Sequence, residues 1–284
     1  MSNSLNKDAP TLSRPAFSME RHARSTLRKT LVVCGTLTVM LIVIAIIALL
    51  IAMLLPVLGR AKEQANRVVC LSNHKQLLLA VAFYCNDNKG YVPHCNWLGQ
   101  EDAARCPGWC YDSTVPNVAG FKTEDALKAG GLWRYIRNAK IYRCPFDVPP
   151  YNRPGQTVHP ITSYGFNGSV NGYGRSGPVP FFKLTQWKPS DIIMWELDEY
   201  WTGGANIFND ASNFPPEGIT MRHGARGAKD TNTAAGRNNS SAGAIVSCAG
   251  QSVEWITVKD YFKEAADTGV RTRLWNTPDR ANGH

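Results

Sequence analysis

The most apolar stretch of the chain lies near its N-terminus. There is no charged residue between Lys29 and Arg60, and residues 31–55 are almost entirely apolar. At a rise of ~1.5 Å per residue, this stretch is longer than the roughly 20 residues that a helix needs to cross a bilayer. A buried core helix of this length with no polar face would be unusual. We therefore expect residues 31–55 to form a transmembrane helix that tethers the chain to a membrane.

The helical pattern continues beyond the apolar stretch. From Val57 to Tyr84 apolar side chains recur at helical spacing, with charged and amide side chains on the other face. Pro56 predicts a kink near the bilayer surface. The Asn-Asp-Asn-Lys-Gly run at 86–90 is typical of a helix end. Residues 56–90 are thus predicted to be an amphipathic continuation of the membrane helix.

The pattern changes after Gly90, where Gly and Pro become frequent and apolar runs shorten to strand length. Strands are predicted at 192–195, 244–248 and 252–257, and a helix at 124–138 with Thr123 as its N-cap. The segments 168–180 and 224–243 are typical of loops. We expect residues 91–284 to form an α+β domain in which a small antiparallel sheet with long loops packs on the exposed half of the long helix.

Composition and charge support an anchored, folded protein. Apolar residues make up 44% and charged residues 19% of the 284 residues, which is typical of a globular chain. The net charge is +9, and residues 1–59 contribute six Lys or Arg against two Asp or Glu. These basic residues precede the apolar stretch, so residues 1–30 are predicted to be a cytoplasmic leader facing anionic lipid. The remaining positive charge forms no basic run, and we expect no nucleic-acid partner.

A cleaved signal peptide explains the N-terminal pattern less well. The apolar stretch is too long for a typical signal-peptide core, and no small-x-small cleavage site follows it cleanly. We expect a single-pass protein of the inner membrane, with its N-terminus in the cytoplasm and its C-terminal domain in the periplasm or outside the cell.

Several short stretches together carry a family pattern. They are Ile44–Ala48, Leu54–Leu58, Arg60–Lys62, residues 70–77 and 84–93, Arg143–Asp147 and Ser163–Gly168. The chain resembles the prepilin-type N-terminal cleavage/methylation proteins, a planctomycete-type family of type II secretion pseudopilin-like proteins. The resemblance covers residues 31–93 and, in patches, 140–256. Arg222-His223-Gly224 and residues 250–255 stand where the family has its His…Asp-Gly signature. The resemblance implies a type IV pilin-like fold.

The processing site departs from the family pattern. The family's glycine before the cut falls on Cys34, its first mature residue on Gly35 and its fifth-position glutamate on Val39. A cut after Gly35, which makes Thr36 the first residue, also leaves the fifth position without an acid. Such a glutamate can neutralise the amine of a neighbouring subunit inside lipid, where an unpaired charge is expensive. The signature aspartate is replaced by Ala249. Leader cleavage, methylation and polymerisation therefore stay open.

The resemblance implies a non-enzymatic structural or assembly protein of a type II secretion or type IV pilus-like system. Its partners would be inner-membrane lipid, other pseudopilin subunits and a prepilin peptidase. The alternative is a non-polymerising, anchored extracytoplasmic binding protein, with a glycan or protein ligand, on a pilin-like scaffold. A third reading is an anchored hydrolase, and it rests only on the cluster of acidic residues described below.

Eight cysteines are the next informative feature, because export permits disulfides. Three of them surround a Pro-Gly-Trp sequence, which predicts one local bridge. A zinc site formed by these three with His94 is the alternative, but its spacing is unusual and adjacent His94 and Cys95 would point apart. The resemblance adds two further positions. The disulfide candidates are Cys70, Cys95, Cys106, Cys110 and Cys144, with no pairing deducible.

Acidic residues gather after the predicted strand at 192–195. Glu196 and Asp198 would share a face of an extended chain, and Asp210 follows. Such a cluster is most simply a solvated strand end, but it also suits calcium or a glycosidase pair. Because related pseudopilins use a calcium loop and His223 lies in the family motif, the metal candidates are Glu196, Asp198, Asp210 and His223, with Ca²⁺ as the ion. We find no nucleophile elbow, His-Glu-x-x-His or phosphate-binding loop, and predict no catalytic residue.

Overall fold

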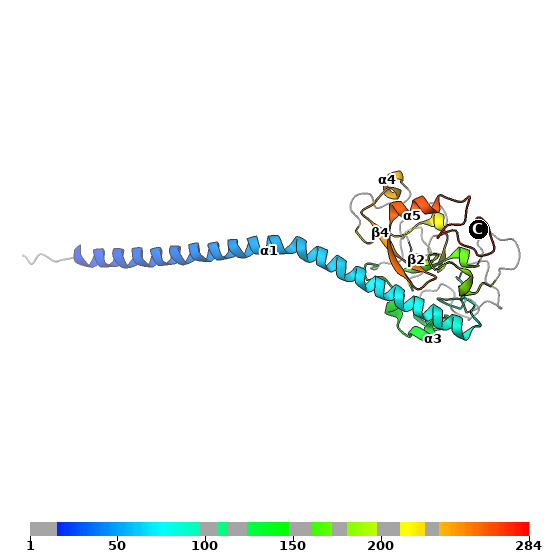
Figure 1. Ribbon diagram of the computed structural model, residues 1–284. Coiled ribbons are helices and arrows are strands. Elements are labelled where there is room, and N and C mark those ends of the chain that lie inside the picture. The colour runs from blue at the N-terminus through cyan, green and yellow to red at the C-terminus, as the bar shows by residue number, and fades with distance from the viewer. Residues whose placement is uncertain are drawn as a thin grey trace, which may run out of the picture. The chain divides into compact units, whose positions relative to one another are not determined.

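The structure is a computed structural model that describes residues 16–96, 107–112, 124–147, 161–171, 181–197, 211–224 and 233–283. The chain divides into two compact units, Met1–Ala61 and Lys62–His284. The first helix, α1 (Ala16–Asp87), is continuous through Pro56 and contributes to both units (Figure 1). The predicted long helix is therefore confirmed, and it begins before the apolar stretch.

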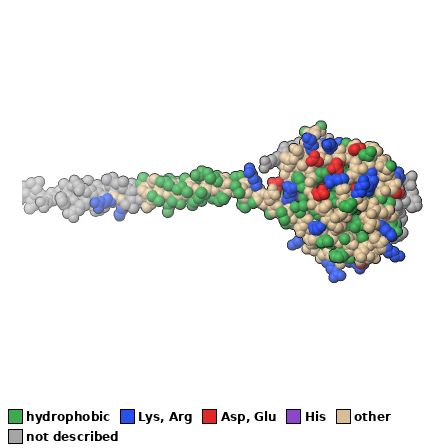
Figure 2. Space-filling view, viewed as in Figure 1, with side chains coloured by type: hydrophobic (Ala, Val, Ile, Leu, Met, Phe, Trp, Pro, Cys, Tyr) green, Lys and Arg blue, Asp and Glu red, His purple; other side chains and the backbone are tan. Residues whose placement is uncertain are grey.

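The first unit carries the apolar surface that the sequence predicts. Between Val33 and Leu58 the large apolar side chains of α1 are all exposed. In the space-filling view these side chains form a continuous apolar surface along the helix (Figure 2). This segment is long and apolar enough to cross a membrane, and none of its most apolar window is buried within the protein. Within the part of the chain that the structure describes, there is thus one candidate membrane span, near the N-terminus.

The C-terminal part of α1 is a core element of the second unit. One face of the helix is buried, and its members recur at helical spacing: Cys70, Leu77, Leu78, Val81 and Cys85. The amphipathic continuation predicted for residues 56–90 therefore has a buried face from Cys70 onward. After Asp87 the chain turns at Gly90, whose φ of 88° suits glycine and whose N–H donates to the Cys85 carbonyl at 2.7 Å.

A five-stranded sheet forms the centre of the second unit. The strands are β1 (Tyr164–Asn167), β2 (Ile192–Glu196), β3 (Ser212–Asn213), β4 (Gly243–Cys248) and β5 (Val253–Thr257). Their order is β3-β1-β2-β4-β5. All pairs are antiparallel except β1 with β3, which is parallel. The sheet is therefore mixed, which corrects the prediction of an antiparallel sheet, while β2, β4 and β5 confirm the three predicted strands.

The two faces of the sheet have separate apolar layers. One layer joins the sheet to the buried face of α1 and includes Ile193, Met194 and Ile245. The other joins it to α5 (Val258–Ala265) and includes Trp195 and Val246. Along β4 the side chains alternate between the layers as a strand requires. Figure 1 shows α5 over the sheet on the side away from α1.

Strand β2 breaks this alternation. Ile193 and Met194 both belong to the α1 layer, and the pairing of β2 with β4 shifts register between Ile192 and Met194. A bulge of this kind changes which face the following side chains reach. As a result Trp195 lies in the α5 layer, and Glu196 points to the α1 side. The bulge therefore brings a carboxylate into the interior beside α1.

The shorter helices correct the prediction of one helix at 124–138. The structure has α2 (Glu124–Lys128) and α3 (Trp133–Ile136) instead, separated by Gly130 and Gly131. A side chain at Gly130 would lie 2.2 Å from the Cys110 carbonyl oxygen, so this close approach requires glycine. Thr123, the predicted N-cap, lies outside the described residues. The remaining short elements are α4 (Ala234–Arg237), η1 (Ala139–Tyr142), η2 (Gly168–Asn171), η3 (Leu184–Gln186) and η4 (Pro215–Glu217).

Candidate metal centre

Four potential metal ligands meet in the interior of the second unit. They are Cys70 on α1, Cys144 after η1, Glu196 at the end of β2 and His223 after η4, where it forms a β-bridge with Gly243 of β4. One ligand atom of each lies within 4.8 Å of those of the other three, and all four side chains are buried. Segments far apart in the sequence thus converge on one point, which we call the Cys₂GluHis cluster.

Three interatomic distances define the cluster. The Sγ atoms of Cys70 and Cys144 lie 3.0 Å apart, beyond the distance of a disulfide bond. His223 Nε2 lies 3.5 Å from the Cys144 sulfur and 3.1 Å from Glu196 Oε1. The histidine nitrogen therefore faces a sulfur and a carboxylate at the same time.

Backbone contacts orient the ligands. Glu196 Oε2 accepts the N–H of Ile245 at 2.8 Å, which leaves Oε1 directed at His223. The N–H of Cys144 donates to Ser163 Oγ at 3.0 Å. The His223 carbonyl accepts the Gly243 N–H at 3.2 Å, which ties the histidine backbone to the start of β4. Each of these three ligands is thus held by a neighbouring element.

The Glu196–His223 pair is an ion pair within the interior. Burial opposes ionisation of Glu196, but the His223 charge and its hydrogen bond outweigh burial and lower the pKa of the carboxyl to about 2. Burial likewise opposes protonation of His223, and the Glu196 carboxylate reverses this and raises the imidazole pKa to about 9. The two groups stabilise each other's charged forms.

The two thiols differ in their tendency to ionise. The hydrogen bond from Cys70 lowers the pKa of the Cys144 thiol to about 7, and His223 acts in the same direction. The pKa of Cys70 is raised, because its S–H donates to Cys144 and because it is buried. Cys144 is consequently the thiol that ionises first, with its thiolate beside the imidazole.

Aromatic side chains and one arginine enclose the cluster. The His223 ring makes edge contacts with Phe146 and Trp255, at centroid distances of 5.1 and 6.1 Å. The Arg67 guanidinium lies 3.7 Å from the Trp255 ring centroid, at a cation–π distance. The aromatic rings lower the local dielectric beside His223.

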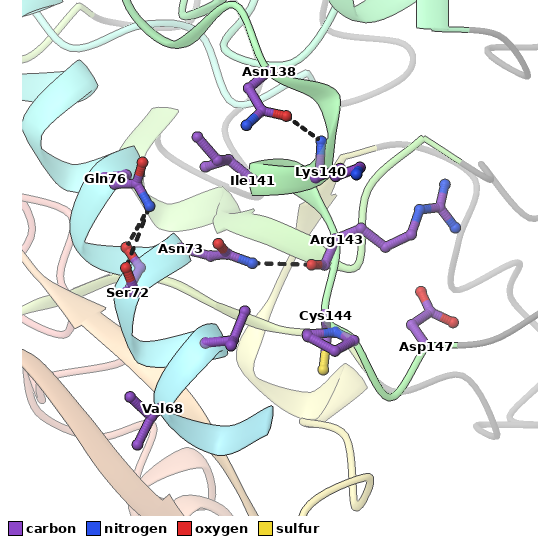
Figure 3. A pocket seen from close by; sticks show the side chains of 12 residues that line it. Val68, Ser72, Asn73, Gln76, Asn138, Lys140, Ile141, Arg143, Cys144 and Asp147 are labelled. Carbon is purple, nitrogen blue, oxygen red and sulfur yellow. Dashed lines mark hydrogen bonds between the residues drawn. The ribbon is translucent and has the colours of Figure 1, made fainter. Parts of the chain in front are cut away.

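A groove of about 710 Å³ runs beside the cluster, between residues 68–76 of α1 and the segment 138–147. Figure 3 shows the helix and this segment on opposite sides of the groove, joined by a hydrogen bond of 3.0 Å from Asn73 Nδ2 to the Arg143 carbonyl. Cys144 lines the groove and also belongs to the cluster. The groove thus borders the cluster at Cys144.

The predicted metal candidates are only partly brought together. Glu196 and His223 are neighbours, as a shared site requires, whereas Asp198 and Asp210 lie outside the described residues. Glu196 is fully buried. The simplest interpretation of the acidic cluster, a solvated strand end, is therefore wrong for Glu196, because the β2 bulge turns this side chain inward.

The disulfide candidates are only partly described. Cys70, Cys110 and Cys144 are buried thiols with no disulfide among them, Cys95 is buried, and Cys106 lies outside the described residues. Among the described cysteines the one close pair is Cys70 with Cys144, which the sequence did not single out as a pair. The local bridge predicted around Pro107 is not formed between Cys95 and Cys110.

The predicted processing residues lie in a regular part of α1. Cys34 and Val39 are exposed, and Gly35 has open space where a side chain would be. The Thr36 hydroxyl donates to the Val33 carbonyl at 2.9 Å, as is common in helices.

Comparison of the chain with family models, with curated proteins and with solved structures finds no match.

Proposed function

We propose that this protein is a membrane-anchored, non-enzymatic pseudopilin-like subunit of a type II secretion or type IV pilus-like system. The observation that carries the proposal is that α1 has two parts, an exposed apolar part and a part that packs in a folded core. The large side chains of residues 33–58 are all apolar and exposed, whereas residues from Cys70 to Cys85 of the same helix form part of a folded core. A pilin-like subunit needs both properties in one helix.

In this function the apolar part of α1 holds the subunit in the inner membrane and packs against the same helix in neighbouring subunits. The hydrophobic effect does not drive association between helices in lipid, so such packing depends on van der Waals contacts between complementary surfaces. The second unit would lie outside the cytoplasm and present its loops to other subunits or to secreted proteins. The full burial of Glu196 fits a structural role for this carboxylate better than a hydrolytic one.

A permanently anchored binding protein on the same scaffold is the second candidate, and a specific observation favours it. There is no Asp or Glu between Glu20 and Glu63, so the helix offers no carboxylate to pair with a neighbour's N-terminal amine inside lipid. A chain of this kind would keep its leader and stay monomeric, with a glycan or protein as its ligand.

The mature N-terminus distinguishes these two candidates. The full chain is produced with a prepilin peptidase and its intact mass is measured. A new terminus at Gly35 or Thr36, methylated or not, supports the pseudopilin proposal. A terminus at Met1, or one lacking only the methionine, rejects processing and supports the permanent anchor.

Polymerisation is tested separately by photo-crosslinking in the membrane. A photoreactive residue replaces Ile46, which is exposed on α1, and a matched variant carries it at Lys259, which is exposed on α5. A ladder of crosslinked oligomers from the Ile46 variant is expected if the helices pack in a fibre. Monomers alone from the Ile46 variant would contradict assembly through α1.

A further inference from the structure

We propose that Cys70, Cys144, Glu196 and His223 bind one zinc ion, which fastens α1 to the sheet of the second unit. The inference does not depend on polymerisation. It requires only that the second unit folds as described.

The spacing of the donor atoms suits tetrahedral coordination. Zinc binds sulfur at about 2.3 Å and imidazole nitrogen at about 2.0–2.1 Å, so the edges of a tetrahedron of such ligands measure roughly 3.3–3.8 Å. The donor distances are 3.0 Å between the two sulfurs, 3.5 Å from the Cys144 sulfur to His223 Nε2, and 3.1 Å from that nitrogen to Glu196 Oε1. Shifts of a few tenths of an ångström would bring these atoms to coordination distances.

The chemistry of the donors selects the metal. Two thiols and an imidazole are the ligands that zinc prefers, and a carboxylate completes a four-ligand set that zinc also accepts. Calcium instead takes six to eight oxygen ligands, and the cluster offers one carboxylate. The donor set therefore points to zinc at this site, rather than to the calcium that the acidic residues alone suggested.

The surroundings supply outer contacts to two of the four ligands, Glu196 and Cys144. The Ile245 N–H holds the carboxylate oxygen that is turned away from the other ligands, and Ser163 holds the Cys144 backbone. All four ligands are buried, which is typical of a closed structural site without an open position for substrate. The proposed role of zinc is thus structural.

A disulfide between Cys70 and Cys144 is the alternative to zinc binding, because neither sulfur is a thiolate ligand once the two are oxidised. A disulfide would join α1 to the Cys144 turn but leave Glu196 and His223 as a bare ion pair. The two outcomes differ in metal content and in free-thiol count, so one preparation distinguishes them.

The experiment uses the full chain, purified from membranes in detergent without added metal or reductant. Zinc per chain is measured by elemental analysis, and free thiols are counted in denaturant before and after chelation. Two ligand variants, Cys70→Ser and His223→Gln, are compared with Cys85→Ser and His74→Gln, which remove a buried thiol or imidazole outside the cluster. Cobalt added to the metal-free chain gives a second readout, since thiolate ligands produce intense sulfur-to-cobalt absorption.

One zinc per chain is expected in the wild type and in the two control variants. Zinc affinity should fall at least about 100-fold in Cys70→Ser and His223→Gln, more than the loss of an outer contact causes. A wild-type chain with reduced thiols that binds neither zinc nor cobalt overturns the proposal. A Cys70–Cys144 disulfide in the purified wild type overturns it as well, and so does equal zinc binding by wild type and ligand variants.

Discussion

Replacing Leu77 tests whether the end of α1 is an integral part of the folded unit. Leu77 is fully buried, whereas Leu79 on the same helix is 45% exposed. Leu77→Ala removes about three methylene equivalents at ~0.8 kcal/mol each, and the cavity left behind adds to this loss. We expect Leu77→Ala to lower the free energy of unfolding by about 3 kcal/mol. Leu79→Ala should cost less than ~1 kcal/mol, because its side chain already contacts solvent.

The assay is urea unfolding of residues 62–284, which form a compact unit, followed by tryptophan fluorescence. Trp109 and Trp195 are fully buried, so their emission reports the loss of the core. The free energy is obtained from the transition midpoint and slope of each variant. Equal destabilisation by Leu77→Ala and Leu79→Ala would refute the assignment of Leu77 to the core face. An unchanged slope is the check that both variants still unfold in one step.

Two further predictions concern local interactions. Burial lowers the pKa of His74 to about 4, below the ~6.5 of a histidine in an unfolded chain. Between these two pH values the unfolded state binds a proton that the folded state does not bind. Stability should therefore fall as the pH falls from about 6.5 to 4. The expected loss in the free energy of unfolding is on the order of 3 kcal/mol. Urea unfolding at several pH values should show that this free energy depends less steeply on pH in His74→Gln than in the wild type. An identical pH dependence in the two proteins contradicts the argument. Thr257 caps α5 by accepting the Asp260 N–H at 3.1 Å, so Thr257→Ala should cost about 1 kcal/mol in urea unfolding. The exposed Lys259→Ala change should cost no more than ~0.5 kcal/mol, and equal effects would argue against a capping role.

The elements with a strong periodic pattern could be predicted from the sequence. The long helix and strands β2, β4 and β5 followed directly from the order of apolar residues. Strand β1 and the two-residue β3 were not predicted, because their pairing depends on partners distant in the chain. The helix expected at 124–138 failed at Gly130, where the decisive factor is the approach of the Cys110 carbonyl. Local patterns contain no information on such contacts.

The candidate site was predicted only in fragments. Glu196 and His223 were proposed as metal ligands, while Cys70 and Cys144 were proposed as disulfide cysteines, and nothing in the sequence joined the two sets. Their meeting depends on the β2 bulge, which turns Glu196 toward α1, and on the position of the Cys144 turn. Both are properties of the folded sheet rather than of any short segment.

The spread of the cluster along the chain also sets the order in which it can form. A polypeptide is synthesised from its N-terminus, so Cys70 emerges first and His223 last, roughly 150 residues later by their numbering. Cys144 emerges before either Glu196 or His223. The two thiols therefore share a period without the imidazole and the carboxylate, before the complete ligand set exists. In an oxidising compartment a disulfide would compete with zinc during this period, so the redox conditions at emergence would matter as well as the affinity of the finished fold.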